Sequence, residues 1–162
     1  MTAPCAFVVR TVRWQEAERS LRAIRHAVFV VEQRVPESLE WDDADASSLH
    51  AIALDDTGRA IGCARLLSDG RIGRVAVLAP WRRRGVGSAL LLRLVGAAGA
   101  RGDARVILKA QVDAMPFYAR HGFVASGDVF DEAGIAHRVM QRPVVVAGAG
   151  PPLHNGDAAG GA

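Results

Sequence analysis

The sequence predicts an α/β (α+β) domain in which helices flank a mixed, mostly antiparallel sheet of six to seven strands. Three observations lead to this prediction. Short segments rich in β-branched residues read as strands, longer apolar segments have helical periodicity, and their order along the chain is β-α-β-β-β-α-β-α-β-β. Strands joined by short turns pair antiparallel, whereas a helical crossover pairs its two strands in parallel, so a mixed sheet follows.

The N-terminal part predicts a strand, a long helix and a loop. Residues Phe7–Trp14 alternate between apolar and polar side chains, as a half-buried strand does. Gln15 to about Val31 places apolar side chains on or near one helical face, and Pro36 ends this helix. The acidic and polar segment Glu37–Ser48 is expected to be a loop.

The middle of the chain predicts a hairpin, a third strand of the meander and a second long helix. His50–Leu54 and Ala60–Leu67 are strands joined by the turn Asp55–Arg59. A further strand follows at about Arg71–Leu78, and a helix runs from roughly Val86 to Ala98.

The C-terminal part completes the sheet. Val106–Ala110 reads as a buried strand, and Met115–His121 as a short helix that Gly122 ends in the left-handed conformation. Phe123–Phe130 and Ile135–Arg142 then form a hairpin.

Length and composition suit one globular domain. The chain has 162 residues, of which 50% are hydrophobic, and we assign residues 1–146 to a single domain. Residues 147–162 contain little to bury and are expected to be a disordered tail. No apolar run approaches the ~20 residues that span a bilayer, and no signal peptide is evident, so we expect a cytoplasmic protein without membrane contact.

The charge pattern argues against a nucleic-acid partner. The net charge is +3, and nearly all basic residues are arginine. They are scattered except at Arg82–Arg84, whereas a nucleic-acid footprint is a continuous basic face or helix.

The most informative segment is the turn between the strand that ends near Leu78 and the following helix. Gly85 and Gly87 lack Cβ atoms, so a ligand can approach the backbone closely at the helix N-terminus. The N–H groups and the helix dipole there favour an anion, and Arg82–Arg84 add positive charge. We expect a phosphate or pyrophosphate site. The turn lacks the Lys-Ser/Thr of a Walker A loop and does not match a dinucleotide-binding fingerprint.

Tyr118 lies on the short helix after the strand Val106–Ala110. Two interpretations remain open: a half-buried tyrosine with its hydroxyl at the surface, or a phenol placed beside the ligand that donates a proton.

Together, these two segments resemble the GNAT superfamily of acetyl-CoA-dependent N-acetyltransferases. The family pattern R/Q-x-x-G-x-G/A is matched by Arg82, Gly85 and Gly87, and its helical tyrosine before Gly-Phe by Tyr118 and Gly122-Phe123. The resemblance covers about Val8–Arg142. Three further segments resemble the bacterial ElaA-like subgroup, namely Val28-Phe-Val-Val-Glu-Gln33, Glu40-Trp-Asp42 and Glu132-Ala-Gly-Ile-Ala-His137.

The resemblance implies a GNAT-like acyl-CoA acyltransferase fold and acetyl-CoA as cosubstrate. The fourth and fifth strands would splay to admit the pantetheine arm, which pairs with the fourth strand as an added strand would. The implied cofactor-binding residues are Val75, Ala76, Val77, Arg82, Arg83, Arg84, Gly85, Val86, Gly87, Ser88, Gln111, Phe117 and Tyr118.

The implied reaction is direct attack of a neutral amine on the thioester. The Val77 N–H would stabilise the developing oxyanion, and Tyr118 would protonate the departing thiolate as general acid. Glu32, near the end of the first long helix, and His137, on the last strand, are candidates for the general base. Each has a plain structural alternative, a solvated glutamate and a hydrogen-bonded histidine.

The acidic segment permits two interpretations. Glu40, Asp42 and Asp45 either form a collar that attracts a cationic amine or belong to a solvated loop. His50 and Cys63 lie in predicted strands and are expected to be structural.

We therefore predict an N-acetyltransferase whose acceptor is a primary amine of a small molecule or peptide. An acyl-CoA-binding sensor with little turnover is the alternative. The histidines are dispersed and no Cys-x-x-Cys motif occurs, so no metal is expected. A homodimer is possible because edge strands of such a sheet can pair between subunits.

Overall fold

The computed structural model describes residues 6–145, so the predicted tail at 147–162 lies outside the described part. The strands are β1 (Phe7–Arg13), β2 (Leu49–Asp55), β3 (Ala60–Leu66), β4 (Ile72–Val77), β5 (Arg105–Gln111), β6 (Val124–Glu132) and β7 (Ile135–Pro143). The α-helices are α1 (Trp14–Arg25), α2 (Glu37–Glu40), α3 (Val86–Ala100) and α4 (Met115–Arg120). Each predicted strand is present, and its ends differ from the prediction by no more than two residues.

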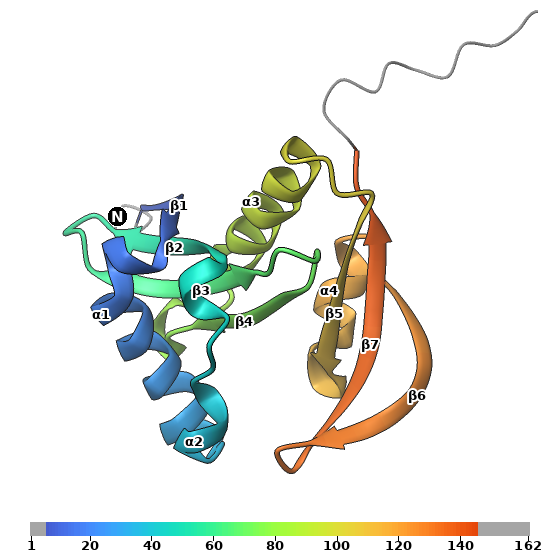
Figure 1. Cartoon of the computed structure of the whole chain (residues 1–162). Helices are drawn as coiled ribbons and strands as arrows, with labels where there is room; N and C mark the ends of the chain where they lie inside the picture. Colours follow the sequence, from blue (N-terminus) through green and yellow to red (C-terminus); the bar gives the residue numbers. More distant parts are fainter. Residues whose placement is uncertain (1–5, 146–162) are drawn as a thin grey trace, which may run out of the picture.

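The seven strands form two antiparallel groups, as Figure 1 shows, with the order β1-β2-β3-β4 in one and β5-β7-β6 in the other. The predicted parallel pairing of β4 with β5 is reduced to one bridge between Arg71 and Ile107. Beside it, the Ile107 N–H donates to Gly70 O at 3.1 Å. The fold class is confirmed, and the predicted splay lies between these two strands.

A bulge in β4 accounts for the divergence of the two groups. Cys63 pairs with Ala76 and Arg65 pairs with Gly73, so two residues of β4 stand opposite one residue of β3. Arg74, one of those two, has φ +52°. A bulge bends its strand and increases the local twist, which turns the free edge of β4 away from β5.

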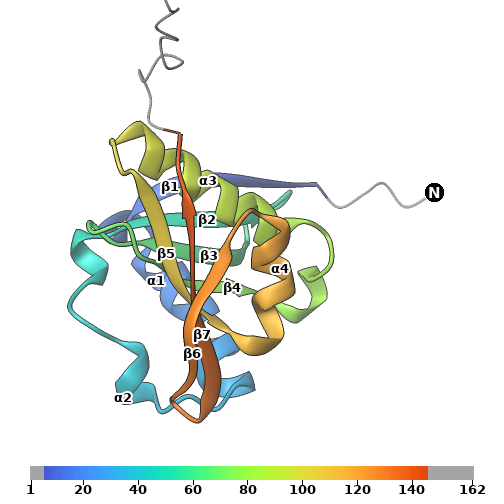
Figure 2. The same ribbon diagram turned by 90° about the vertical axis from the view of Figure 1, so that its right-hand side faces the viewer.

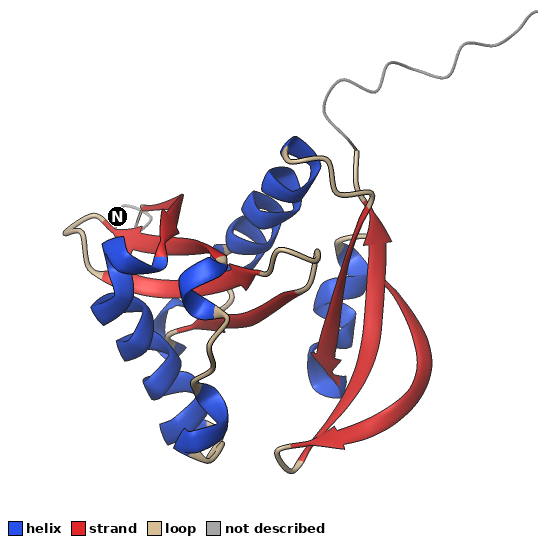
Figure 3. Cartoon of the chain, in the orientation of Figure 1, coloured by secondary structure: helices blue, strands red, loops and turns tan. Residues whose placement is uncertain are grey.

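Helices α1 and α3 cover opposite faces of the first sheet (Figure 3). Ala51 and Ala53 of β2 pack with Leu90 and Leu94 of α3 in one cluster, whereas Ile52 packs with the α1 side. Alternate side chains of a strand point to opposite faces, so β2 contributes to both halves of the core.

The predicted first helix changes type at Arg25. The chain continues from His26 to Glu32 as a π-helical segment, in which Gln33 N–H donates to Val28 O at 3.1 Å. The wider turn keeps Val28 and Phe29 both buried and rotates the residues that follow. Val31 is therefore 62% exposed, and its predicted place on the apolar face was wrong.

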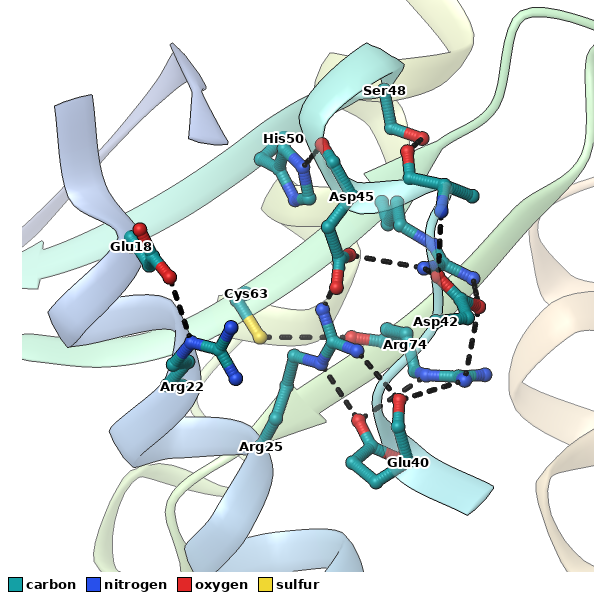
Figure 4. Close-up of polar contacts among 12 residues, drawn as sticks. Glu18, Arg22, Arg25, Glu40, Asp42, Asp45, Ser48, His50, Cys63 and Arg74 are labelled. Carbon is teal, nitrogen blue, oxygen red and sulfur yellow. Dashed lines mark hydrogen bonds and ion pairs between the residues drawn. The ribbon is translucent and has the colours of Figure 1, made fainter. Parts of the chain in front are cut away.

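The predicted solvated loop before β2 is also incorrect in part, because Glu40 and Asp45 are buried (Figure 4). Arg25 donates from Nε to Glu40 Oε1 and from Nη1 to Asp45 Oδ1, both at 2.7 Å. Arg65 donates to Asp45 Oδ1 at 3.0 Å and to both carboxylate oxygens of Asp42. Burial of a charge is unfavourable unless it is paired, and these ion pairs explain why an acidic segment folds inward.

Burial and hydrogen bonding shift the pKa of Arg25 in this network and of His50 beside it. Burial lowers the pKa of Arg25, but hydrogen bonds to Asp45 and Glu40 outweigh that effect and raise the pKa above its ordinary value. The His50 ring bonds through Nε2 to the Asp45 carbonyl at 2.9 Å, and burial lowers the pKa of His50. Cys63 is buried as well, so the structural interpretation of His50 and Cys63 holds.

The network predicts a large loss of stability for Arg25→Ala. This change leaves the carboxylates of Glu40 and Asp45 buried without their shared guanidinium, which costs about 3–5 kcal/mol of unfolding free energy. Urea denaturation measures it. The control is Arg22→Ala on the same helix, whose exposed pair with Glu18 contributes under about 1 kcal/mol. Equal losses for the two variants would contradict the prediction.

Candidate functional site

A cleft of about 990 Å³ occupies the space between the two strand groups. In the view of Figure 2, β5, β6, β7 and α4 lie in front of the first sheet. The cleft is lined by β4, the N-terminus of α3, β5, α4 and β7, together with part of the π-helical segment. It therefore lies where the predicted splay was expected to admit a ligand.

The glycine turn opens α3 toward this cleft. Gly85 is the N-cap with φ +82°, a left-handed conformation that L side chains rarely adopt, and no side chain caps the helix. The first intrahelical bond runs from the Ala89 N–H to Gly85 O, so the N–H groups of residues 86–88 have no partner within the helix. A Cβ on Gly87 would lie 3.4 Å from Phe117 Cζ. This end of α3 is therefore a close-packed cradle of donors suited to an anion.

Arg82 and Glu32 contact each other, although the sequence predicts separate roles for them: Arg82 in cofactor binding and Glu32 as a candidate general base. Arg82 Nη2 lies 2.9 Å from both carboxylate oxygens of Glu32, and its Nε donates to Val77 O at 2.9 Å. Glu32 is not among the residues that line the cleft. Arg84 does not line it either, because its guanidinium stacks over Trp81 at 5.2 Å.

The Val77 N–H points into the cleft. Leu78 N–H donates to Ile61 O at 2.9 Å, and the neighbouring pair is Gly62 with Val77. Hydrogen-bonded and non-hydrogen-bonded pairs alternate along an antiparallel ladder, so the backbone groups of Val77 face away from β3. Its C=O accepts from Arg82 on that side, and its N–H shares the direction.

Tyr118 lies half-buried on the cleft wall formed by α4. Its ring packs edge-on against Phe117 at 5.1 Å and Phe123 at 5.8 Å between centroids. Burial raises the pKa of Tyr118 to about 12. The phenol is therefore protonated throughout the neutral range and is a possible proton donor.

Two polar pairs join cleft-lining residues to residues far away in sequence. Gln111 donates from its side-chain amide to Gln33 Oε1 at 2.8 Å, and Ser88 Oγ lies 2.9 Å from His121 Nε2. Desolvation, together with Arg120, lowers the pKa of His121. Gln111 and Ser88 were among the predicted residues. Gln33 also lines the cleft and was missed because no local pattern marks it, whereas His121 contacts Ser88 without lining the cleft itself.

His137 lies on the opposite wall, nearly buried, on β7. Its Nδ1 bonds to Ile135 O at 2.7 Å and its ring stacks on Phe130. Since a carbonyl only accepts, Nδ1 carries the proton in the neutral ring and Nε2 keeps its lone pair. Beside it, Lys109 Nζ donates to Glu132 at 2.9 Å.

Among residues 6–145, no group of three or more His, Cys, Asp or Glu side chains is arranged to hold a metal ion. No helix in this described range has the length and apolar character needed to cross a membrane.

Comparison with known proteins gives a consistent result. A family model described as an acetyltransferase (GNAT) domain matches residues 12–143. The uncharacterised N-acetyltransferase YjcF of Bacillus subtilis is 37% identical over 123 residues, covering 74% of this chain and 87% of that protein. The protein ElaA of Escherichia coli is 30% identical over 153 residues, covering 84% of this chain and 99% of its own length.

Solved structures share the fold. A putative N-acetyltransferase from Lactobacillus plantarum superposes with a TM-score of 0.78 and 25% identity, covering 86% of this chain and 99% of that one. The crystal structure of Escherichia coli ElaA gives a TM-score of 0.74 with 28% identity, covering 83% and 99%.

Proposed function

Because this chain belongs to the GNAT family of acetyltransferases and is therefore an acyltransferase, we propose that it transfers an acetyl group from acetyl-CoA to a primary amine by direct attack. The observation that carries the proposal is the uncapped, glycine-opened N-terminus of α3 beside the free edge of β4. The family uses an acyl-CoA cosubstrate generally, and this membership favours an enzyme over a binding module without turnover.

The residues of the cleft fit a CoA ester. Its pyrophosphate would lie against the N–H groups of residues 86–88, where the helix dipole favours negative charge and Arg83 adds a cation at the rim. The pantetheine arm would lie along Val75–Val77, whose outward backbone groups offer it strand-like hydrogen bonds. Gln111, the last residue of β5, lines the cleft and would bond an amide of that arm.

Two groups would assist the breakdown of the thioester, the Val77 N–H and the Tyr118 hydroxyl. The amine nitrogen bonds to the thioester carbon, the C–S bond breaks, and the Val77 N–H stabilises the oxygen as it gains charge. Tyr118 would then give its proton to the thiolate sulfur.

For the general base, the geometry favours His137 over Glu32. Both oxygens of Glu32 accept from Arg82, and Glu32 lies away from the cleft lining. His137 lines the cleft and has its Nε2 lone pair available in the tautomer set by Ile135 O. It would take the proton that the attacking ammonium must lose. Glu32 would instead hold Arg82, and through it the strand-to-helix turn.

The cofactor site is tested by Gly87→Glu. A carboxylate in the first turn of α3 would repel the pyrophosphate, and like charges in contact cost several kcal/mol, so affinity for CoA should fall about a hundredfold or more. Isothermal titration calorimetry measures this. Gly96→Glu, on an exposed part of the same helix with open space around it, is the control. Unchanged CoA binding in Gly87→Glu would remove the basis of the proposal.

Tyr118→Phe should lower kcat about tenfold to a hundredfold while leaving the affinity for CoA near that of the wild type. The reason is that the variant lacks the hydroxyl that donates the proton, whereas its ring still packs against Phe117 and Phe123. To obtain kcat, the CoA released in the presence of each amine of a panel is measured with a reagent that reacts with its thiol. Because the Tyr118 pKa is about 12, its contribution should stay constant from neutral pH to about pH 10. A wild-type kcat in the variant would exclude the acid role.

His137→Gln should lower kcat/KM for amines at least tenfold, because the amide cannot accept the proton at neutral pH. CoA affinity should not change, since His137 lies on the wall away from the glycine turn. Glu32→Gln is the comparison: it weakens the pair with Arg82 and should affect thermal stability and CoA binding more than proton removal. The reverse pattern of losses would assign the base to Glu32.

A further inference from the structure

The end of the cleft away from the glycine turn contains an arginine that the proposed chemistry does not use. Arg74 lines the cleft at the bulge of β4, and 26% of its side chain is exposed. With φ +52° it adopts a left-handed backbone conformation that is unfavourable for a residue with a Cβ. Bulges next to active sites commonly redirect a side chain, and strained residues concentrate at ligand sites.

The guanidinium of Arg74 lies beside Glu40 and Asp42 (Figure 4), but these contacts do not satisfy all of its donors. Its Nη2 donates to the backbone O of Glu40 at 3.0 Å and lies 3.5 Å from Asp42 Oδ2. Its Nε is 3.2 Å from Glu40 Oε1 but not in hydrogen-bond geometry, so this buried nitrogen has no hydrogen-bond partner. Within residues 6–145, its Nη1 donates no hydrogen bond to another residue.

The carboxylates near Arg74 are already engaged by other arginines. Glu40 Oε1 accepts from Arg25 at 2.7 Å, and Asp42 Oδ2 accepts from Arg65 at 3.0 Å, each closer than Arg74. Burial and the neighbouring Arg65 and Arg25 leave the pKa of Arg74 lowered in spite of Glu40 and Asp42. An additional anion at this guanidinium would therefore be stabilised.

The opposite wall of the cleft faces Arg74 with a second cation. Lys109 binds Glu132 there, and the hydrogen bond from Lys109 is the main cause of a lowered Glu132 pKa. The charge of Arg74 adds to that effect, and Arg74, Lys109, Glu132 and His137 all line the cleft. An acidic collar for a simple cationic amine is not what this arrangement provides, because Glu132 and the nearby Glu40 and Asp42 are already paired.

We propose that the amine acceptor also carries a carboxylate, which the guanidinium of Arg74 binds at this end of the cleft. The inference rests on the proposed N-acetyltransferase function and names the class of its acceptor. Arg74 stands three residues before Val77, a span of at most about 10 Å along the strand, which the bulge shortens. The carboxylate of the acceptor is therefore separated from its reacting nitrogen, as in an ω-amino acid or a peptide-like amine.

The test compares matched acceptors with the wild-type chain and acetyl-CoA. The probes are β-alanine, γ-aminobutyrate and ε-aminocaproate, each beside its primary amide, which has the same amine chain without the charge. We expect kcat/KM for the acid to exceed that for its amide about tenfold or more in at least one pair, since a hydrogen bond to a charged group is lost in the amide. Equal values in every pair, with measurable turnover, would overturn the inference.

A substitution then assigns the preference to Arg74. In Arg74→Gln the acid and its amide should become equal within about twofold, mainly through a higher KM for the acid, and Arg74→Lys should keep part of the preference. Arg59→Gln, in the exposed β2–β3 turn, removes the same charge away from the cleft and should keep it fully. An undiminished preference in Arg74→Gln would exclude this residue as the carboxylate site.

Failure of the proposed function and failure of the acceptor assignment give different results. If Arg74→Gln does not fold, the wild-type acid–amide comparison and Arg74→Lys still decide the question. If no amine of any kind gives acceptor-dependent CoA release, the proposed function itself fails. If amines without a carboxylate react as well as the amino acids do, only the assignment of the acceptor class fails.

Discussion

The divergence of β4 from β5 is the constraint on which the site depends. One parallel bridge joins the two strands, and beyond it the bulge at Arg74 turns the edge of β4 away. An edge with unpaired backbone groups normally invites aggregation, and here it forms one wall of the cleft. The same divergence brings the N-terminus of α3, Tyr118 and His137 to one space, although they come from three separate parts of the chain. A continuous sheet would close that space.

The buried ionic network supports this geometry from the other face of the sheet. Arg25 and Arg65 fix Glu40 and Asp45, so the segment between α1 and β2 is held against β4. Buried ion pairs contribute little net stability compared with an apolar core, because desolvation opposes their attraction. They hold a polar segment in place beside the bulge, and they leave the cleft-lining guanidinium of Arg74 with weaker contacts to Glu40 and Asp42 than those of Arg25 and Arg65.

Burial also explains the acid–base properties assigned to the cleft. Desolvation raises the pKa of Tyr118, so the phenol stays protonated at neutral pH. A hydrogen bond to Ile135 O sets the tautomer of His137 and leaves Nε2 as the acceptor. The pair of Arg82 with Glu32 links the π-helical segment to the glycine turn. One cleft therefore brings together a protonated phenol, a histidine whose Nε2 keeps its lone pair and the uncapped N-terminus of α3, each defined by a different local contact.

The sequence alone determined the order of the strands and helices, the fold class and the glycine-opened turn, because these depend on contacts within a few residues. Periodicity marks α3, and Gly85 and Gly87 mark the turn that opens it. Tyr118 and the glycine turn also identified the family, since their combination is specific. The tertiary structure decided which charges are buried and which residues meet. Val31 is exposed because a π-helical turn rotates it, and Glu40 and Asp45 are buried because arginines distant in sequence reach them. Gln33 meets Gln111, His121 meets Ser88, and Arg74 faces the cleft only because the strands diverge. Such long-range pairings leave no periodic signal along the chain.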